Sequence, residues 1–194
     1  MKAWQHFRTI THHRHLVMKG CFQVGLYKQG LLHDLSKYAP VEFLVGCKYY
    51  QGTQSPNNAE RKDKGYSLAW LHHKGRNKHH FEYWIDYGMG DEPFMTGMKM
   101  PVNYVVEMFI DRVSASKNYQ GAAYKDDSAL IYYEHGKGKY MLHPESARLL
   151  EELLTMLSEQ GEQETFRYIR QEVLHNQKTE REIVDNGERK EDIV

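Results

Sequence analysis

The sequence predicts an all-α fold, and two observations carry that prediction. Over several long stretches the apolar residues recur at the three- and four-residue spacing of an amphipathic helix. Prolines stand at the start of several stretches and glycines at the end of others, as is usual where helices begin and end. No segment of the chain predicts a strand. We therefore expect one helical core with a C-terminal helical extension.

The first third of the chain predicts two long helical stretches followed by a loop. Residues 8–29 lack proline and carry apolar residues at helical spacing, with Gly30 as the expected end. Residues 31–50 predict a second helical stretch that restarts near Pro40. The run 52–65 is polar and predicts a loop.

The middle of the chain predicts short elements around a long irregular segment. Residues 67–73 predict a short helix, and the aromatic-rich residues 81–87 are a second helical candidate. Residues 88–100 contain three glycines, one proline and four methionines. This composition predicts a long loop, which is either an ordinary surface loop or a lid over a site.

The last half of the chain predicts the central helix of the fold and three further helices. Residues 101–119 are apolar around most of the helix circumference, which is typical of a central helix. Residues 128–135 predict a short helix. Residues 144–159, closed by Gly161, and residues 165–177 are amphipathic.

The length and composition predict one soluble domain. The chain has 194 residues, with 26 basic and 26 acidic side chains. This balance argues against a general nucleic-acid binder and against a polybasic membrane-surface protein. No apolar run is long enough for a membrane span, and the N-terminus has no signal core, so we expect a cytoplasmic protein. We expect a metal-binding helical domain over 1–160, a C-terminal helix over 161–178 and a charged tail over 179–194.

Histidine is the unusual residue of this sequence. The chain has 12 histidines, and nine of them lie in the first 80 residues. They include the adjacent His12 and His13, the doublet of His33 with Asp34, and a cluster over residues 72–80. Imidazole nitrogens and carboxylate oxygens are the ligands that zinc, iron, manganese, nickel and cobalt accept. The pattern therefore predicts a site for one or two divalent transition metal ions.

Asp111 is a further residue that points to a metal site. It lies within the predicted central helix, at the edge of the apolar arc. A carboxylate that is partly buried there needs a cation or strong hydrogen-bond donors to offset its desolvation. Pairing with Arg14, Arg76 or Lys117 is the simpler alternative for this aspartate.

The order of these residues resembles that of the HD-domain superfamily of metal-dependent phosphohydrolases. The resemblance matches one of the early histidines, the His33–Asp34 doublet and Asp111. Lys37 follows the doublet as in the His-Asp-x-x-Lys variant of the motif. In related cyclic-dinucleotide phosphodiesterases, additional histidines in the following interval supply a second metal. The Asp-Gly-x-Gly-Tyr-Pro string of those enzymes is absent here, so the resemblance does not imply their substrate.

A closer resemblance is to an uncharacterised bacterial family of HD-like proteins. That family shows the string His-Asp-Leu-Ser-Lys-Tyr and then His-x-x-x-Asn-x-His-His. The second pattern matches His73, Asn77, His79 and His80. The resemblance covers about the first 160 residues and implies an HD-domain-like helical bundle, but it implies no established activity.

The metal ligands can be assigned from spacing together with this resemblance. Among His12, His13 and His15 we favour His13, which is in line with Gly20 on an inward-facing helix surface. We expect one ion to be held by His13, His33, Asp34 and Asp111. A second ion would share Asp34 and take two of His73, His79 and His80. His72 is the expected spectator, because neighbouring side chains on a helix point apart.

These residues predict a metal-dependent phosphohydrolase that acts on a small phosphate ester or nucleotide. Asp34 and Lys37 are the expected catalytic residues, and Lys37, Arg76 and Asn77 are the expected substrate contacts. Two alternatives stay open. One is a non-catalytic metal- or ligand-binding interaction module, and the other is a di-iron oxygenase on the same scaffold.

Overall fold

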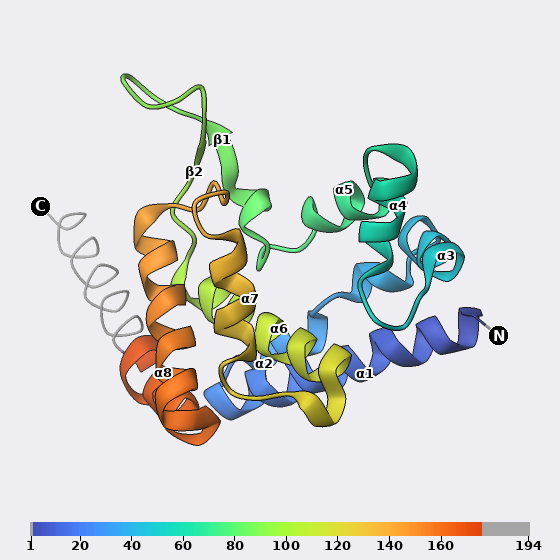
Figure 1. The fold of residues 1–194 in the computed structure, drawn as a ribbon. Helices are drawn as coiled ribbons and strands as arrows, with labels where there is room; N and C mark the ends of the chain where they lie inside the picture. Colours follow the sequence, from blue (N-terminus) through green and yellow to red (C-terminus); the bar gives the residue numbers. More distant parts are fainter. Residues whose placement is uncertain (1, 176–194) are drawn as a thin grey trace, which may run out of the picture.

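The computed structural model describes residues 2–175, which form an all-α fold with one small two-stranded sheet (Figure 1). The α-helices in order are α1 (Lys2–Val24), α2 (Tyr27–Leu32), α3 (Pro40–Tyr49), α4 (Pro56–Lys64), α5 (Leu68–Lys74), α6 (Val102–Gln120), α7 (Ser128–Gly136) and α8 (Pro144–Tyr168). Between and after them lie the 3-10 turns η1 (Leu35–Tyr38), η2 (Phe81–Trp84) and η3 (Gly121–Ala123), the strands β1 (Ile85–Tyr87) and β2 (Met95–Gly97), and a π-helical turn, η4 (Ile169–Val173).

The central position predicted for residues 101–119 is confirmed by α6. This helix contacts α1, α7 and α8, and eight of its residues are buried. Its apolar side chains pack against Val17 and Cys21 of α1 and against the fully buried leucines of α8, which are Leu150, Leu153, Leu154 and Leu157. The apolar core therefore lies around α6, and the polar residues that α6 carries are held at fixed positions by that packing.

Gly20 explains how closely α1 approaches α6. A Cβ atom at Gly20 would lie 2.7 Å from Cγ2 of Ile110, a distance that a side chain cannot occupy. The small residue lets the two backbones pack closely at this point. His13 lies two helical turns before Gly20 on the same face, and Asp111 follows Ile110, so this contact brings the histidine toward the aspartate.

The predicted end of the first helix at Gly30 is wrong. The chain instead breaks after Val24, where Gly25 has a positive φ of 89°, and Gly30 lies inside the short helix α2. A Cβ at Gly30 would lie 2.9 Å from Cβ of Cys21. Gly30 is therefore needed for close packing of α2 on α1 rather than as a helix terminator.

The polar run 52–65 is also not simply a loop, because its second half forms α4. Pro56 occupies the first turn of α4, and Gly65 ends it with φ of 80°. Only Ala59 and Glu60 of this helix are buried. A helix that buries two residues leaves no apolar periodicity in the sequence, which is why the pattern predicted a loop.

The segment predicted to be a loop over residues 88–100 contains β2. This strand pairs with β1 in antiparallel register, with Asp86 opposite Thr96, and the hairpin projects from the helical body (Figure 1). Three-residue strands are too short for an alternating pattern to show in the sequence. Residues 81–84 form the 3-10 turn η2 rather than an α-helix.

The helix predicted after Pro144 ends where it was expected, at Gly161. Gly161 has a non-helical backbone with φ of 79° and ψ of 172°, so it separates two helical segments within α8. The predicted helix over 165–177 corresponds to the end of α8 and η4, and its last two residues lie outside the described part of the chain. The predicted tail over 179–194 also lies outside it. No helix within residues 2–175 combines the length and apolarity needed to cross a membrane.

Candidate metal centre

His33 and Asp34 lie in a sharp turn between α2 and η1. Asp34 has a positive φ of 55° and is the only non-glycine residue of the described chain with a left-handed backbone. Aspartate tolerates this conformation better than most residues, but the conformation still carries strain. The turn buries both side chains almost completely, and Nε2 of His33 lies 3.3 Å from Oδ2 of Asp34.

A first donor group combines residues from α1, the turn and α6. Nε2 of His13 lies 2.9 Å from Oδ1 of Asp111 and 3.6 Å from Oδ2 of Asp34. Nε2 of His33 lies 3.5 Å from the same Asp111 oxygen. The four donor atoms of His13, His33, Asp34 and Asp111 thus converge on one point from three elements.

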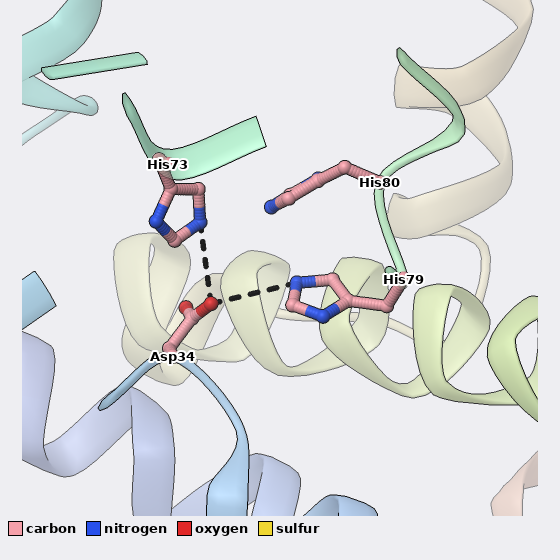
Figure 2. A group of neighbouring side chains, drawn as sticks. All are labelled: Asp34, His73, His79 and His80. Carbon is pink, nitrogen blue, oxygen red and sulfur yellow. Dashed lines mark ion pairs between the residues drawn. The ribbon is translucent and has the colours of Figure 1, made fainter. Parts of the chain in front are cut away.

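A second donor group lies on the other side of the same carboxylate. Nε2 of His73 is 3.2 Å and Nε2 of His79 is 3.5 Å from Oδ1 of Asp34. Figure 2 shows these two rings directed at Asp34, with the ring of His80 between them. Asp34, His73, His79 and His80 form a group whose donor atoms lie within 4.8 Å of one another. Asp34 therefore belongs to both groups, with one oxygen directed to each.

The donor atoms fit a metal ion in both hydrogen bonding and spacing. Several of them are buried and have no hydrogen bond of normal geometry within the described chain: Nε2 of His13, His33, His79 and His80, and Oδ1 of Asp34. Leaving a buried polar atom unpaired costs about 1–3 kcal/mol, so a cation at this point would stabilise the fold. Metal bonds of about 2.0–2.2 Å place neighbouring donors roughly 3–3.5 Å apart, as they are here.

Glu107 of α6 orients two of these imidazoles and was not predicted from the sequence. Its Oε1 accepts hydrogen bonds from Nδ1 of His33 at 2.9 Å and from Nδ1 of His79 at 3.1 Å. Bonding at Nδ1 fixes each ring and leaves Nε2 directed at the metal position. The available signal was a second acidic residue one turn before Asp111 in an otherwise apolar helix.

Glu42 of α3 has the same role for the other group. Its two oxygens accept hydrogen bonds from Nδ1 of His72 at 2.5 Å and from Nδ1 of His73 at 2.8 Å. His72 belongs to none of the donor groups in the described residues. Asn77 helps to hold His73 in place, because its Nδ2 donates to the backbone carbonyl of His73 and to Oγ of Ser36.

The electrostatics of the site match a cation held between carboxylates. Burial raises the pKa of Asp34, but the nearby His33, Lys37 and His73 outweigh burial and hold that pKa well below its ordinary value. Burial likewise opposes the charged form of His33, yet Asp34, Asp111 and Glu107 raise its pKa well above 6.5. The carboxylates therefore favour a proton on the imidazole of His33, and a metal ion can replace such a proton.

The pKa of His80 shifts in the opposite direction from the pKa of His73, which is raised. Burial lowers the pKa of His80 well below the ordinary value, and the adjacent His79 and His73 lower it further. Its ring lies 4.2 Å from that of His79 and packs edge-on against Trp70. A neutral imidazole with a free Nε2 is the form that ligates a metal.

Among the early histidines the structure brings only His13 to the site. His13 is buried, whereas His12 and His15 are exposed, and Nδ1 of His12 hydrogen bonds to Asn118. This arrangement follows from α1 burying the face that contains His13, Val17 and Gly20.

The predicted substrate contacts occupy three different environments. Lys37 forms an ion pair with Oδ2 of Asp34. Burial lowers the pKa of Lys37, but Asp34 and Asp111 outweigh it and raise that pKa above its ordinary value. Asn77 is engaged in the hydrogen bonds described above, and the exposed Arg76 donates to the backbone carbonyl of His72.

A cavity of about 570 Å³ opens beside the donor groups. Its walls include His13, His73, His80 and Asp111 together with Lys37, so the metal position forms part of its surface. Ligand pockets for small molecules have volumes of roughly 300–1,000 Å³. Arg76 and Asn77 are not among the residues that line it.

Comparison with known proteins gives a family but no activity. A sequence model described as a family of unknown function (DUF5662) matches residues 2–156. No curated protein and no solved structure matches the chain.

Proposed function

The chain belongs to DUF5662, a family of unknown function, and we propose that it is a metal-dependent phosphohydrolase acting on a small phosphate ester or nucleotide. The observation that carries this proposal is the shared carboxylate of Asp34. Its two oxygens face two separate donor groups at the wall of one cavity. Paired metal positions that share a ligand beside a substrate cavity are typical of enzymes that hydrolyse phosphate esters.

In this proposal His13, His33, Asp34 and Asp111 hold one divalent ion. Asp34 also takes part in the second position, with its partners drawn from His73, His79 and His80. The nitrogen-rich donor set suits iron, manganese, zinc, nickel or cobalt. When bound, such ions polarise phosphoryl oxygens and activate water near neutral pH.

The residues around the metal position have separate roles in the proposed reaction. Lys37 remains protonated near neutral pH, so its ammonium neutralises charge on a phosphoryl oxygen. Glu107 and Glu42 keep the imidazoles oriented through their Nδ1 atoms. Asn77 holds the backbone of His73 in place, and Arg76 is kept as a candidate contact for a substrate that extends to the surface.

The motif order supports the same reaction class. A histidine, a His-Asp doublet and a later helical aspartate occur in this order in HD-domain phosphohydrolases, which they resemble. On this proposal residues 1–160 are the HD-like metal-binding domain of a cytoplasmic enzyme. The reaction class rests on the metal donors rather than on the fold alone.

The test combines metal content with phosphate release. The full chain is purified without a histidine tag and its metal content is measured by mass spectrometry, beside Asp34→Ala and Asp111→Ala. Asp91→Ala, a change at an exposed aspartate of the β1–β2 connection, is the matched control. We expect one or two equivalents of a transition metal in the wild type and the control, and substoichiometric metal in the two site variants.

The same proteins are then assayed for phosphate release from a panel of phosphate monoesters and nucleotides with added manganese, iron or nickel. Release that depends on Asp34 supports the proposal. Absence of turnover above the Asp34→Ala background with every metal would overturn it and favour a non-catalytic binding module. Bound iron with substrate-dependent oxygen uptake would instead identify a di-iron oxygenase.

A further inference from the structure

Arg112 is a half-buried cation on the wall of the cavity. It follows Asp111 on α6 and lines the same cavity as the donor groups. Its Nε is buried and has no hydrogen-bond partner in the described chain, and Glu82 is near enough to its guanidinium for a coulombic interaction. Arg112 as a whole is only half-buried, so the rest of its guanidinium is available to an anionic ligand in the cavity.

Two tyrosines hold this guanidinium in position. Cζ of Arg112 lies 5.6 Å from the ring centroid of Tyr133 and 5.4 Å from that of Tyr140. The two rings stack on each other at 5.5 Å, and Oη of Tyr133 donates to Glu151. Cation–π contacts fix a planar group without satisfying its N–H donors. The guanidinium group is therefore ordered before any ligand arrives, which reduces the conformational entropy lost on binding.

The charges that line the cavity limit the ligand to one anionic group. Among the described residues that line the cavity, the lysine and arginine side chains are Lys37 and Arg112. Lys37 is already paired with Asp34. Glu42 is engaged by His72 and His73. Glu82 lies near Arg112 on the wall, and Asp111 belongs to the first donor group, so little positive charge is left for a second anionic group.

Where α1 faces the α3–α4 connection and the first turn of α4, the cavity wall carries polar, uncharged side chains. It presents side chains such as Thr9, Tyr50, Gln54 and Asn57 to the cavity. Uncharged hydroxyl and amide groups suit a neutral hydrogen-bonding body rather than a further phosphate. The ligand that fits these walls thus has one anionic end and a neutral polar remainder.

We propose that Arg112 anchors a single phosphate group, and that the cavity takes a monophosphate ester with a neutral polar body. The guanidinium presents two parallel N–H donors, which match the oxygens of a phosphate. Asp111 and Arg112 are consecutive, so an anchored phosphate lies beside the donor group that contains Asp111. This inference specifies the substrate class of the proposed phosphohydrolase and rests on that proposal for the reaction.

The test measures binding of inorganic phosphate to the metal-loaded full chain by titration calorimetry. The variants are Arg112→Gln and Arg112→Lys, with Arg148→Gln on the exposed face of α8 as the matched control. Loss of a charge-assisted pair is expected to weaken phosphate binding by about 10- to 100-fold in Arg112→Gln. Arg112→Lys keeps the positive charge but lacks the two parallel N–H donors, so we expect a smaller loss of phosphate affinity. Arg148→Gln should bind phosphate as the wild type does.

Metal content and thermal unfolding are measured on every variant, which separates this inference from the proposed hydrolysis. Unchanged metal content with weakened phosphate binding in Arg112→Gln supports the anchor, whether or not any ester is turned over. If Arg112→Gln binds phosphate as tightly as the wild type, or if the wild type binds acetate as tightly as phosphate, the anchor is refuted. Adenosine monophosphate and diphosphate are compared in the same way, and a diphosphate that binds more than about tenfold tighter would refute the single anionic group.

Discussion

Asp34 is the residue on which both donor groups depend. It combines a strained left-handed backbone, nearly complete burial and two carboxylate oxygens that face different imidazoles. A residue in this state is stable only when its surroundings compensate for both strain and desolvation. Here the compensation comes from His33, His73 and Lys37, and a bound cation would add to it.

Glu107 gives a prediction about a residue that orients two of the proposed ligands. Oε1 of Glu107 accepts from Nδ1 of both His33 and His79. Glu107→Gln therefore removes the negative charge next to these two imidazoles while keeping the side-chain shape. We expect metal affinity to fall by about 10- to 100-fold. Competition with a chelator measures this change, with Glu145→Gln as the surface control. Equal affinities in Glu107→Gln and the wild type would contradict the orienting role.

His6 gives a prediction about pH. Its ring is buried against Gly46, between Phe43 and Tyr50. Burial, aided by Lys37, lowers its pKa from 6.5 to about 4. The unfolded chain therefore takes up this proton at a higher pH than the folded protein does, so His6 destabilises the fold as pH falls from about 6.5 to about 4.

The contribution of His6 is isolated by a variant that does not titrate. Thermal unfolding of the wild type and of His6→Asn is compared at about pH 7.5 and about pH 5, with metal saturating in both. We expect the drop in Tm on acidification to be smaller for His6→Asn. An equal drop in the two proteins would show that His6 does not contribute to acid sensitivity.

At the scale of elements, helix ends depend on local backbone chemistry and helix faces depend on packing. Pro40, Pro56 and Pro144 each stand in the first turn of a helix, which the fixed φ of proline favours. Glycine was less informative. Gly25 and Gly65 break or end helices with a positive φ, whereas Gly20 and Gly30 lie inside helices where a neighbouring element comes too close for a side chain.

Gly161 provides the test at this scale. Its φ of 79° lies in the region that only glycine adopts readily, and its carbonyl accepts a hydrogen bond from Thr165. A Cβ would meet Oδ2 of Asp126 at an ordinary contact distance of 3.5 Å, so strain rather than a clash decides the outcome. We expect Gly161→Ala to lower the free energy of unfolding by about 1–3 kcal/mol.

Chemical denaturation of Gly161→Ala and of Gln160→Ala measures the effect. Gln160 is the exposed neighbour with an ordinary helical environment, and its replacement by alanine should change stability by less than about 0.5 kcal/mol. If both variants unfold like the wild type, the kink in α8 does not require glycine.

At the scale of the whole molecule, the candidate metal centre joins parts of the chain that are far apart in sequence. Its donors come from α1, the turn before η1, the α5–η2 region and α6. A metal ion bound to all of them would bind the folded chain and not the unfolded one. The stability of the whole domain should therefore depend on metal concentration.

Metal removal tests this coupling. At a free metal concentration about 100 times Kd, binding stabilises a fold by about 2.7 kcal/mol, which corresponds to a Tm increase of roughly 5–10 °C for a domain of this size. Calorimetry with and without a chelator measures the shift. Asp34→Asn should show no such shift, and a wild-type Tm that is indifferent to metal would contradict a site that spans these elements.

The all-α class, the central helix and the residue types of the candidate metal centre can be predicted from the sequence alone. These depend on local periodicity and on the chemistry of His33, Asp34, His73 and Asp111, which a single chain displays without reference to its fold. Only the folded chain shows which early histidine lies beside Asp111, that Glu107 contacts the Nδ1 atoms of two imidazoles, and that Arg112 lines the cavity next to Asp111. Those facts depend on contacts between elements remote in sequence. Such contacts are fixed by close packing at points such as Gly20 against Ile110, which no local pattern reveals.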